Sequence, residues 1–281
     1  MLGKKNELVK KANIKSVVAS ALGVCRKNIY RKSIKEEKDL LLKADIEEAW
    51  EKHPAYGHLR LGWHLKVNHK RISRVMRKFG MKPPRRKIKR YCTVMSPGEV
   101  YFNLIKDWSP TKPNELWCAD VSYIKFQDRF WYISTIEDIF TRRVLAVQVS
   151  KRHDSYLIFK SIKQAVASSK TFPKIFHTDQ GTEYMAKLVT NYLEANNVDI
   201  SVSDKGSPWQ NGFQESLFGR FKDESGDLNR FDTTGEFVEA IYGQVHYYNY
   251  ERIHTALRMP PATYHQLVQT GLQKWGTVSN V

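Results

Sequence analysis

The sequence has few cysteines, a deficit of acidic residues and no long apolar run. Its three cysteines, Cys25, Cys92 and Cys118, are odd in number and far apart, which argues against a disulfide framework and indicates reduced thiols. No Cys-x-x-Cys accompanies the histidines at 53, 58, 64 and 69, so a structural zinc site is not indicated. No secretory signal and no segment of membrane-spanning length is present. The sequence therefore predicts a soluble, cytoplasmic protein.

The charge of the chain is concentrated in its first part. The formal net charge is +17 over 281 residues, and residues 1–110 hold 27 Lys and Arg against 10 Asp and Glu. Residues 111–281 hold 19 of each kind, so they carry no net charge. A basic folded region most often binds a polyanion, and nucleic acid is the commonest. The alternative is a solvated basic surface without such a partner.

Residues 1–35 are predicted to form a helix-turn-helix. An apolar helix begins near Ser16, a turn follows at Gly23, and a second, basic helix contains Arg26 and Lys27. In helix-turn-helix proteins the second helix enters the major groove of DNA, so Arg26 and Lys27 are candidate DNA contacts. The alternative is a helical hairpin that packs without touching DNA.

Residues 36–81 are predicted to form a second helical domain that binds DNA. A helix is expected over 36–50, a break at His53-Pro54, and further helices over 56–65 and 68–79. The last helix has an apolar face, and the basic residues Lys70, Arg71 and Arg74 on the remaining surface are candidate DNA contacts. Gly80 is a suitable helix stop.

Residues 82–111 are predicted to be a basic linker. Its Pro83-Pro84 start cannot be helical, and the following Arg85, Arg86 and Lys87 can track a phosphate backbone. A solvated linker without DNA contact is the alternative.

From Pro113 the apolar pattern changes to that of strands. Strands are expected over 115–126, 130–139 and 143–150, followed by a helix over 153–169, a strand over 174–179, a helix over 184–197, a strand over 199–203 and then a helix that contains Glu215. This order predicts an α/β, ribonuclease-H-like fold, with a mixed five-stranded sheet flanked by helices. The core is expected over 112–226, with a helical extension over 227–281.

Three carboxylates fall on suitable elements for metal-assisted phosphoryl transfer. Asp120 lies within the first strand, Asp179 closes the fourth, and Glu215 lies on the following helix. Magnesium prefers oxygen ligands, and two such ions can hold the attacking and leaving oxygens of a displacement at phosphorus. Four nearby acids compete for the same roles: Asp138, Glu183, Asp204 and Glu224.

The helix that carries Glu215 has a marked start and one polar face. Ser207 and Gln210 have the spacing of a capping box. Asn211, Glu215 and Lys222 recur at helical spacing on one face. Asn211 and Lys222 are therefore candidate DNA contacts beside Glu215.

Four motifs together resemble a known family. They are Trp117-Cys-Ala-Asp120, Asp138-Ile-Phe-Thr-Arg-Arg143, His177-Thr-Asp179-Gln-Gly-Thr-Glu-Tyr184 and Ser207-Pro-Trp-Gln-Asn-Gly-Phe-Gln-Glu215 with its continuation to Lys222. They are similar to the retroviral-integrase-type core of bacterial insertion-sequence transposases of the copy-out, paste-in kind. In that family Gln usually stands where this chain has Glu183.

The resemblance implies a function and a site. Asp120, Asp179 and Glu215 would be the catalytic triad holding two Mg²⁺ ions, for which Mn²⁺ can substitute, and Lys222 would contact the element end. The expected activity is cleavage of element ends and joining of the 3′-hydroxyl to DNA. The expected partners are double-stranded terminal repeats and target DNA, a second or further copy of the chain, and an upstream reading-frame product as a fusion.

Two alternatives remain beside this hypothesis. One is a catalytically inactive, integrase-like regulator that binds DNA. The other is a ribonuclease acting on RNA–DNA hybrids, against which the basic helix-turn-helix region argues.

Overall fold

The computed structural model describes residues 8–9, 11–25, 34–83, 101–106, 108–204 and 212–271. The chain divides into two compact units. Residues 1–52 and 61–82 form one, called the helical unit, and residues 53–60 and 83–281 form the other, called the sheet unit. The domain boundaries predicted at residues 35, 81, 111 and 226 remain predictions.

The described part of the helical unit is all α-helical. α2 (Lys15–Ala21) ends before Gly23, whose φ of +63° suits the predicted turn. α4 (Ile34–Lys52) and α6 (His69–Lys78) pack on each other. Ile72 and Val75 of α6 are fully buried, which confirms the predicted apolar face.

The sheet unit is built on a mixed sheet that has five strands in the described residues, in the order β3-β2-β1-β4-β5. The strands are β1 (Leu116–Phe126), β2 (Arg129–Asp138), β3 (Arg143–Ser150), β4 (Ile175–Thr178) and β5 (Asp199–Val202). β1, β2 and β3 pair antiparallel, whereas β4 pairs parallel with β1 and with β5. The predicted ribonuclease-H-like architecture is confirmed, with β1 at the centre.

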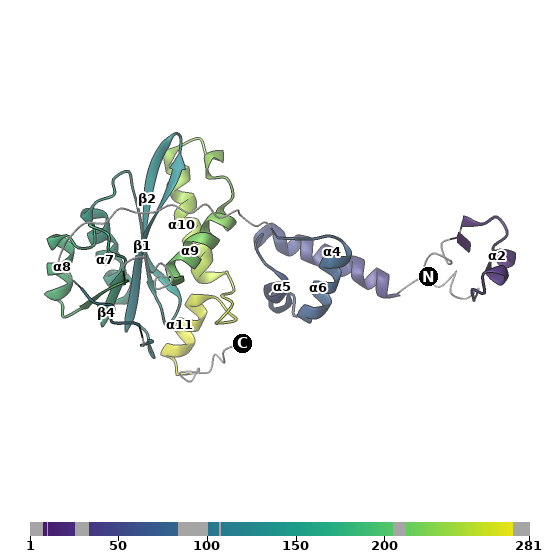
Figure 1. Cartoon of the computed structure of the whole chain (residues 1–281), viewed down its shortest axis with the longest axis horizontal. Helices are drawn as coiled ribbons and strands as arrows, with labels where there is room; N and C mark the ends of the chain where they lie inside the picture. The colour runs from purple at the N-terminus through teal and green to yellow at the C-terminus, as the bar shows by residue number, and fades with distance from the viewer. Residues whose placement is uncertain are drawn as a thin grey trace. The chain divides into compact units, whose positions relative to one another are not determined.

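Helices cover both faces of this sheet (Figure 1). α7 (Ser155–Ser169) and α8 (Lys187–Glu194) lie on one face, and α9 (Gly212–Ser225), α10 (Thr234–Tyr250) and α11 (Pro261–Gln269) lie on the other. α10 begins at a capping box, in which the Glu236 N–H donates to Thr233 and the Thr233 N–H donates to Glu236. Among the described helices, none combines the length and apolar character needed to cross a bilayer.

Alternation along β1 sends its side chains into two cores. Trp117 is fully buried with Ile158 of α7 on one face. Phe126, an odd number of positions further along, packs on the other face with Phe218 of α9 and Phe237 of α10. Because successive strand residues point to opposite faces, the even-numbered positions of β1 lie on the same sheet face as Phe126.

The segment His53–Arg60, which we call the strap, belongs to the sheet unit although helical-unit residues flank it in sequence. α4 ends at Lys52, as the predicted break at His53-Pro54 requires, and α5 (His58–His64) begins within the strap. Tyr56 is fully buried, and its hydroxyl accepts a 2.8 Å hydrogen bond from the Ile253 N–H. A second contact joins His53 Nδ1 to the Tyr247 hydroxyl at 2.8 Å. The strap is thus held by partners almost 200 residues away.

A buried histidine ties β4 to β5 just before the strand ends. His177 Nδ1 lies 2.9 Å from the Ser201 hydroxyl, and Nε2 lies 3.0 Å from the Ser203 hydroxyl. Burial lowers the pKa of His177 to about 4, so the folded protein holds this imidazole neutral.

We expect this histidine to make the sheet unit acid-sensitive. Its pKa in the unfolded chain is about 6.5, so acidification from pH 6.5 to 4 protonates only the unfolded state and removes about 3 kcal/mol of stability. Denaturant unfolding across this pH range should show a shallower decline in His177→Gln than in the natural chain. His246→Gln, at a histidine with a 66 % exposed side chain, is the control. Equal declines in His177→Gln and the natural chain would contradict the prediction.

Candidate active site

Asp120 lies within β1, and Asp179 directly follows the neighbouring parallel strand β4, which ends at Thr178 instead of at the predicted residue 179. Cys118 of β1 pairs with His177 of β4, and each aspartate comes two residues later in the chain. Neighbouring strands are about 4.8 Å apart, and paired residues of parallel strands point to the same face. The two aspartates therefore come from neighbouring strands near the centre of the sheet, and the charges of both act on the Tyr184 hydroxyl.

α9 covers the sheet face to which these aspartates point. Asp120 and Phe126 both occupy even-numbered positions of β1, and Phe126 packs with Phe218 and Phe221 of α9. Glu215 lies in the first turn of the same helix, three residues before Phe218. Its backbone is thus on the helix that covers this face, while its side chain lies outside the described part of the chain.

The loop after β4 folds tightly around Asp179. The Gly181 N–H donates a 3.0 Å hydrogen bond to Asp179 Oδ1. Burial raises the pKa of Asp179; the Gly181 hydrogen bond opposes this shift, and the Glu183 carboxylate adds to it. A Cβ at Gly181 would lie 2.7 Å from the carboxyl carbon of Glu183, so the missing side chain leaves the space that Glu183 fills. The loop therefore brings a further carboxylate close to Asp179.

Glu183 is paired with a histidine that sequence reasoning missed. His153 Nε2 lies 2.7 Å from Glu183 Oε1, and its ring stacks on Tyr132 with centroids 4.9 Å apart. The hydrogen bond with Glu183 raises the pKa of His153. Burial is the largest single influence on Glu183 and raises its pKa, but the hydrogen bond and charge of His153, together with hydrogen bonds from the Glu183 N–H and the Thr182 hydroxyl, lower the pKa overall. Both shifts favour the ion pair, which places a positive charge near Asp179.

Two buried hydroxyls adjoin the aspartates. Burial raises the pKa of Tyr184 well above its ordinary value, and the carboxylates of Asp179 and Asp120 raise it further. The Tyr184 and Thr178 hydroxyls contact each other and have no other hydrogen-bond partner among the described residues. The site therefore has polar groups beneath its carboxylates.

The donor set suits a hard divalent cation. Asp120 and Asp179 offer only oxygen, which is the ligand type of Mg²⁺. Burial and the charge of Glu183 both disfavour ionised Asp179, so a cation bound there would relieve both effects. Among the described side chains, no three His, Cys, Asp or Glu groups come close enough to hold a metal. Glu215 on α9 is the predicted third ligand.

The remaining acids that the sequence left open have structural partners. Asp138 is buried and accepts hydrogen bonds within the β2–β3 turn. Glu224 forms an ion pair with Arg252, with Oε1 and Nη2 2.7 Å apart. Asp204 lies 3.8 Å from Lys106 Nζ. Glu183 alone among the competing acids lies beside Asp179.

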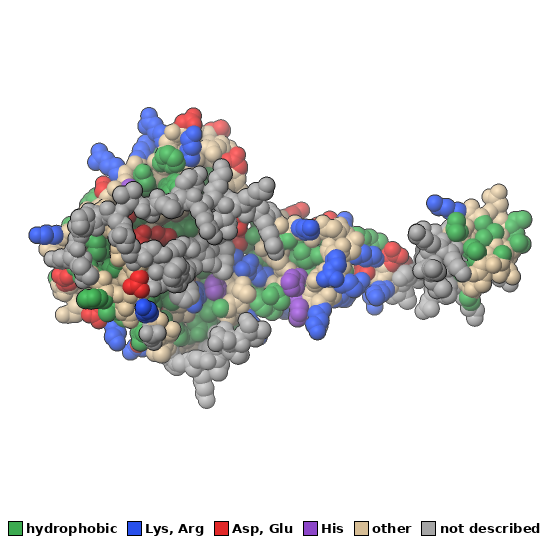
Figure 2. All heavy atoms as spheres, in the orientation of Figure 1, with side chains coloured by type: hydrophobic (Ala, Val, Ile, Leu, Met, Phe, Trp, Pro, Cys, Tyr) green, Lys and Arg blue, Asp and Glu red, His purple; other side chains and the backbone are tan. Residues whose placement is uncertain are grey.

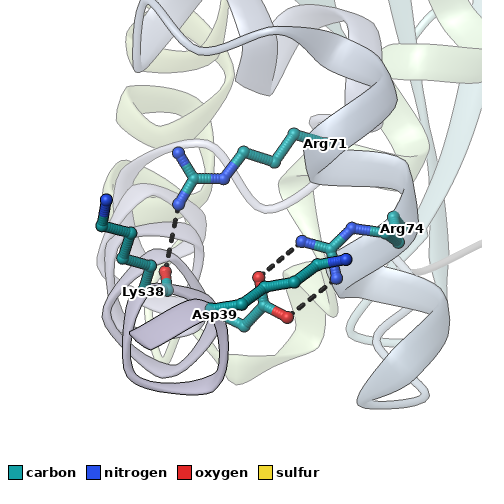
Figure 3. A pocket seen from close by; sticks show the side chains of 5 residues that line it. Lys38, Asp39, Arg71 and Arg74 are labelled. Carbon is teal, nitrogen blue, oxygen red and sulfur yellow. Dashed lines mark hydrogen bonds and ion pairs between the residues drawn. The ribbon is translucent and has the colours of Figure 1, made fainter. Parts of the chain in front are cut away.

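The basic candidates in the helical unit differ in their surroundings. Basic side chains are visible along α4 to α6 in Figure 2. Arg74 donates to both carboxylate oxygens of buried Asp39, at 2.8 and 2.5 Å, and thereby joins α6 to α4 (Figure 3). These hydrogen bonds hold the pKa of Asp39 well below its usual range. Arg71 is exposed and donates to the Lys38 carbonyl, and Lys70 is exposed. Arg74 thus has a structural partner, and the DNA contacts of all three residues remain predictions.

Several predicted contacts fall outside the described residues. They are the positions Arg26, Lys27, Arg85, Arg86, Lys87 and Asn211, together with the side chain of Lys222. Their predicted roles stay predictions.

Comparison with known proteins identifies the family. Residues 110–208 and 196–261 match two protein-family models, both described as integrase core domain. An uncharacterized transposase-like protein of Haemophilus influenzae is 34% identical over 203 residues, covering 71% of this chain and 94% of that protein. The transposase for insertion sequence element IS904 of Lactococcus lactis is 29% identical over 202 residues, covering 69% of this chain and 78% of that protein.

A solved structure shares the fold. It is the simian T-cell lymphotropic virus intasome in complex with PP2A regulatory subunit B56 gamma, with a TM-score of 0.50 and 16% identity, covering 75% of this chain and 70% of that chain. This likeness agrees with the mixed sheet. The chain belongs to the insertion-sequence transposases that carry an integrase core domain.

Proposed function

We propose that this protein cleaves the ends of an insertion element and joins the freed 3′-hydroxyl to DNA. The observation that supports the proposal is the position of Asp120 in β1 and of Asp179 directly after the neighbouring parallel strand β4, with α9 packed on the face of β1 that bears Asp120. Family membership makes DNA transposition the expected process. In this proposal Asp120, Asp179 and Glu215 form the catalytic triad.

The three proposed carboxylate ligands come from different structural elements. Asp120 is fixed within the central strand, Asp179 is held just after β4 by the Gly181 N–H, and Glu215 lies on the helix that packs over the face of β1 bearing Asp120. Two Mg²⁺ or Mn²⁺ ions bound by these carboxylates would stabilise the charge that develops at phosphorus and activate the attacking oxygen. The ionised form of Asp179, which burial disfavours, is the form that this role requires.

The proposed reaction has two displacements at phosphorus. In the first, a water oxygen attacks the phosphodiester at the element end, and the bond to the 3′-oxygen breaks to free a 3′-hydroxyl. In the second, that hydroxyl attacks another phosphodiester, so one P–O bond forms as another breaks. Each step exchanges one phosphodiester oxygen for another, and no covalent protein–DNA intermediate is needed. Joining one end to the other would give a circular intermediate for later insertion.

The DNA itself is proposed to be held by the basic part of the chain. Residues 1–110 carry the whole excess of 27 basic over 10 acidic residues, so binding should weaken steeply with salt. Lys222, seven residues after Glu215 on the same helical face, would hold a phosphate beside the site. Two paired ends require at least two copies of the chain, and the upstream reading-frame product is a further proposed partner.

A strand-transfer assay tests this proposal. The full chain is incubated with labelled duplex carrying the terminal repeat of its own element, in Mg²⁺ or with a chelator. We expect nicked and joined products in Mg²⁺, none with chelator, and recovery when Mg²⁺ is restored, because the carboxylates need the ion to act. A duplex with a scrambled terminus is the control. Salt-sensitive binding without any product would instead identify a DNA-binding regulator.

A further inference from the structure

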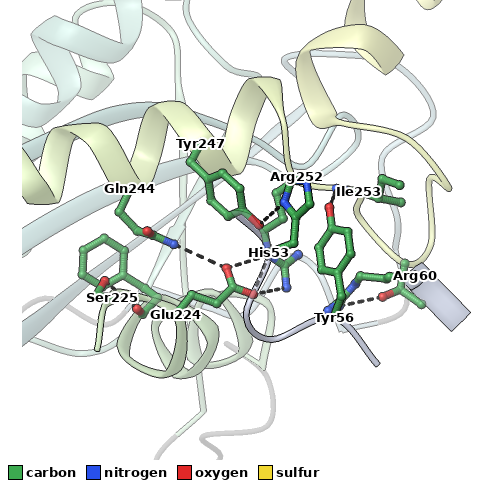
Figure 4. Close-up of polar contacts among 11 residues, drawn as sticks. His53, Tyr56, Arg60, Glu224, Ser225, Gln244, Tyr247, Arg252 and Ile253 are labelled. Carbon is green, nitrogen blue, oxygen red and sulfur yellow. Dashed lines mark hydrogen bonds and ion pairs between the residues drawn. The ribbon is translucent and has the colours of Figure 1, made fainter. Parts of the chain in front are cut away.

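Glu224 and Arg252 form a buried ion pair between α9 and the chain just after α10. Arg252 Nε lies 2.8 Å from both carboxylate oxygens of Glu224, and the two side chains are 0 % and 3 % exposed. Gln244 of α10 adds a 3.4 Å contact to Glu224 Oε2. Figure 4 shows Glu224 and Arg252 pointing toward each other, with Tyr56 and His53 of the strap nearby.

The Glu224–Arg252 pair lies on the face of α9 opposite to Glu215. Glu224 follows Glu215 by nine residues, and at about 100° per residue the two positions are half a turn apart. Leu217, seven residues before Glu224, shares its face and packs against Val144 and Tyr248. Lys222, seven residues after Glu215, falls on the other face. The buried pair therefore fixes how α9 is rotated about its axis.

The strap packs beside the same ion pair. The Tyr56 hydroxyl is bonded to the N–H of Ile253, the residue next to Arg252, and His53 contacts Tyr247. Arg252 is 1 % exposed as a whole residue. With water excluded, a change of helix rotation would separate two charges in a medium of low polarity, which is costly.

The Glu224–Arg252 pair is better suited to setting the orientation of α9 than to stabilising the fold. Arg252 Nη1 has no hydrogen-bond partner among the described residues, and Nη2, although 2.7 Å from Glu224 Oε1, is poorly aligned with it. Burying two charges carries a large desolvation cost, and apolar residues of similar volume often stabilise a protein as well. What an apolar pair lacks is a preferred geometry.

We propose that Arg252, acting through Glu224, is a positioning residue that fixes the rotation of α9 and so the place of Glu215 and Lys222. The inference rests on the proposed function only in that Glu215 is taken as catalytic. It also gives a reason why the strap, whose chain continues directly from α4, is packed into the sheet unit.

The test is the double change Glu224→Met with Arg252→Met, which replaces the pair by apolar side chains. We expect a melting temperature no more than about 5 °C below that of the natural chain. Hydrogen exchange of the α9 amides should be at least about tenfold faster, with α7 unchanged. Strand transfer at saturating DNA should fall on the order of 10- to 100-fold, because small misplacements of catalytic groups are costly.

Two further variants frame the result. Lys125→Met with Asp128→Asn removes an exposed ion pair of the same unit and should leave α9 exchange unchanged. Arg252→Lys keeps the charge without the forked contact and should give intermediate exchange in α9. Unchanged exchange of α9 in the double variant would overturn the proposal, as would a melting temperature more than about 10 °C lower, since the pair would then serve stability. Exchange needs no reaction, so absence of strand transfer in the natural chain would count against the proposed function alone.

Discussion

Changing Asp120 to Asn is expected to lower the rate of strand transfer by about 10³-fold or more, and Asp179→Asn should do the same. Each change keeps the size of the side chain and removes the charge of one of the two aspartates that we propose as metal ligands. DNA affinity, measured by fluorescence anisotropy without divalent metal, should be retained because the excess basic charge lies in residues 1–110. The rate is measured at saturating DNA in Mg²⁺.

The Asp179 variant has a second signature, in stability. Because burial raises the pKa of Asp179 in the folded protein, the ionised form at pH 7 costs folding stability, and a neutral Asn removes this cost. Asn can also accept the Gly181 hydrogen bond that now ends at Asp179 Oδ1. Asp179→Asn should therefore melt at or above the natural chain in metal-free buffer while losing activity, a trade-off common at active sites.

Asp128→Asn is the matched control for both variants. Asp128 has a 95 % exposed side chain in the β1–β2 turn and a φ of +59°, a conformation that Asn tolerates. Its strand-transfer rate should equal that of the natural chain. If Asp120→Asn or Asp179→Asn kept the rate of this control, that aspartate would have no place in the triad.

The second large effect is expected in the core beneath α10. Phe237 is fully buried, stacked on Phe126 with ring centroids 4.3 Å apart and tilted against Trp131 at 5.5 Å. Phe237→Ala would leave a cavity between the β1–β2 hairpin and α10, which should lower the free energy of unfolding by about 3–5 kcal/mol. Denaturant unfolding followed by tryptophan fluorescence would measure this loss.

Phe130 provides the comparison on the same hairpin. Its side chain is 53 % exposed and meets Tyr123 edge-on. Phe130→Ala should cost less than about 1 kcal/mol. Similar losses of unfolding free energy in Phe237→Ala and Phe130→Ala would mean that Phe237 of α10 does not pack in a buried core.

The sheet and its aspartates could be predicted because their signals are local. Runs rich in β-branched and aromatic residues, separated by short polar joins, mark β1 to β3, and short apolar runs bounded by turns mark β4 and β5. Helix ends were predicted less closely: α8 begins at Lys187, after a turn that includes Tyr184, instead of at residue 184. Tyr184 of that turn packs in the core with Trp117 and Val189. Helix propensity carries no information about such tertiary packing, so it cannot place the helix start.

The polar pairs could not be predicted because their partners are distant in sequence. His153 and Glu183 come from the start of α7 and the loop after β4, and neither shows a periodic pattern. Asp39 is one of several acids on α4 that no local pattern distinguishes, yet it is buried against Arg74. Arg252 stands in a turn whose composition indicates a solvated loop, and only folding brings Glu224 to it.

The strap limits where recombination between related elements can join their coding sequences. A recombination joint placed near Pro83 would separate the sheet unit from His53–Arg60 and leave Tyr247 and Ile253 without their present partners. A hybrid that takes its first 82 residues from a related element must therefore carry a strap that fits the surface around Tyr247 and Ile253 of this sheet unit. The chain passes between the two units at three points, one on each side of the strap and one near Pro83, and selection on shuffled elements would act on all three.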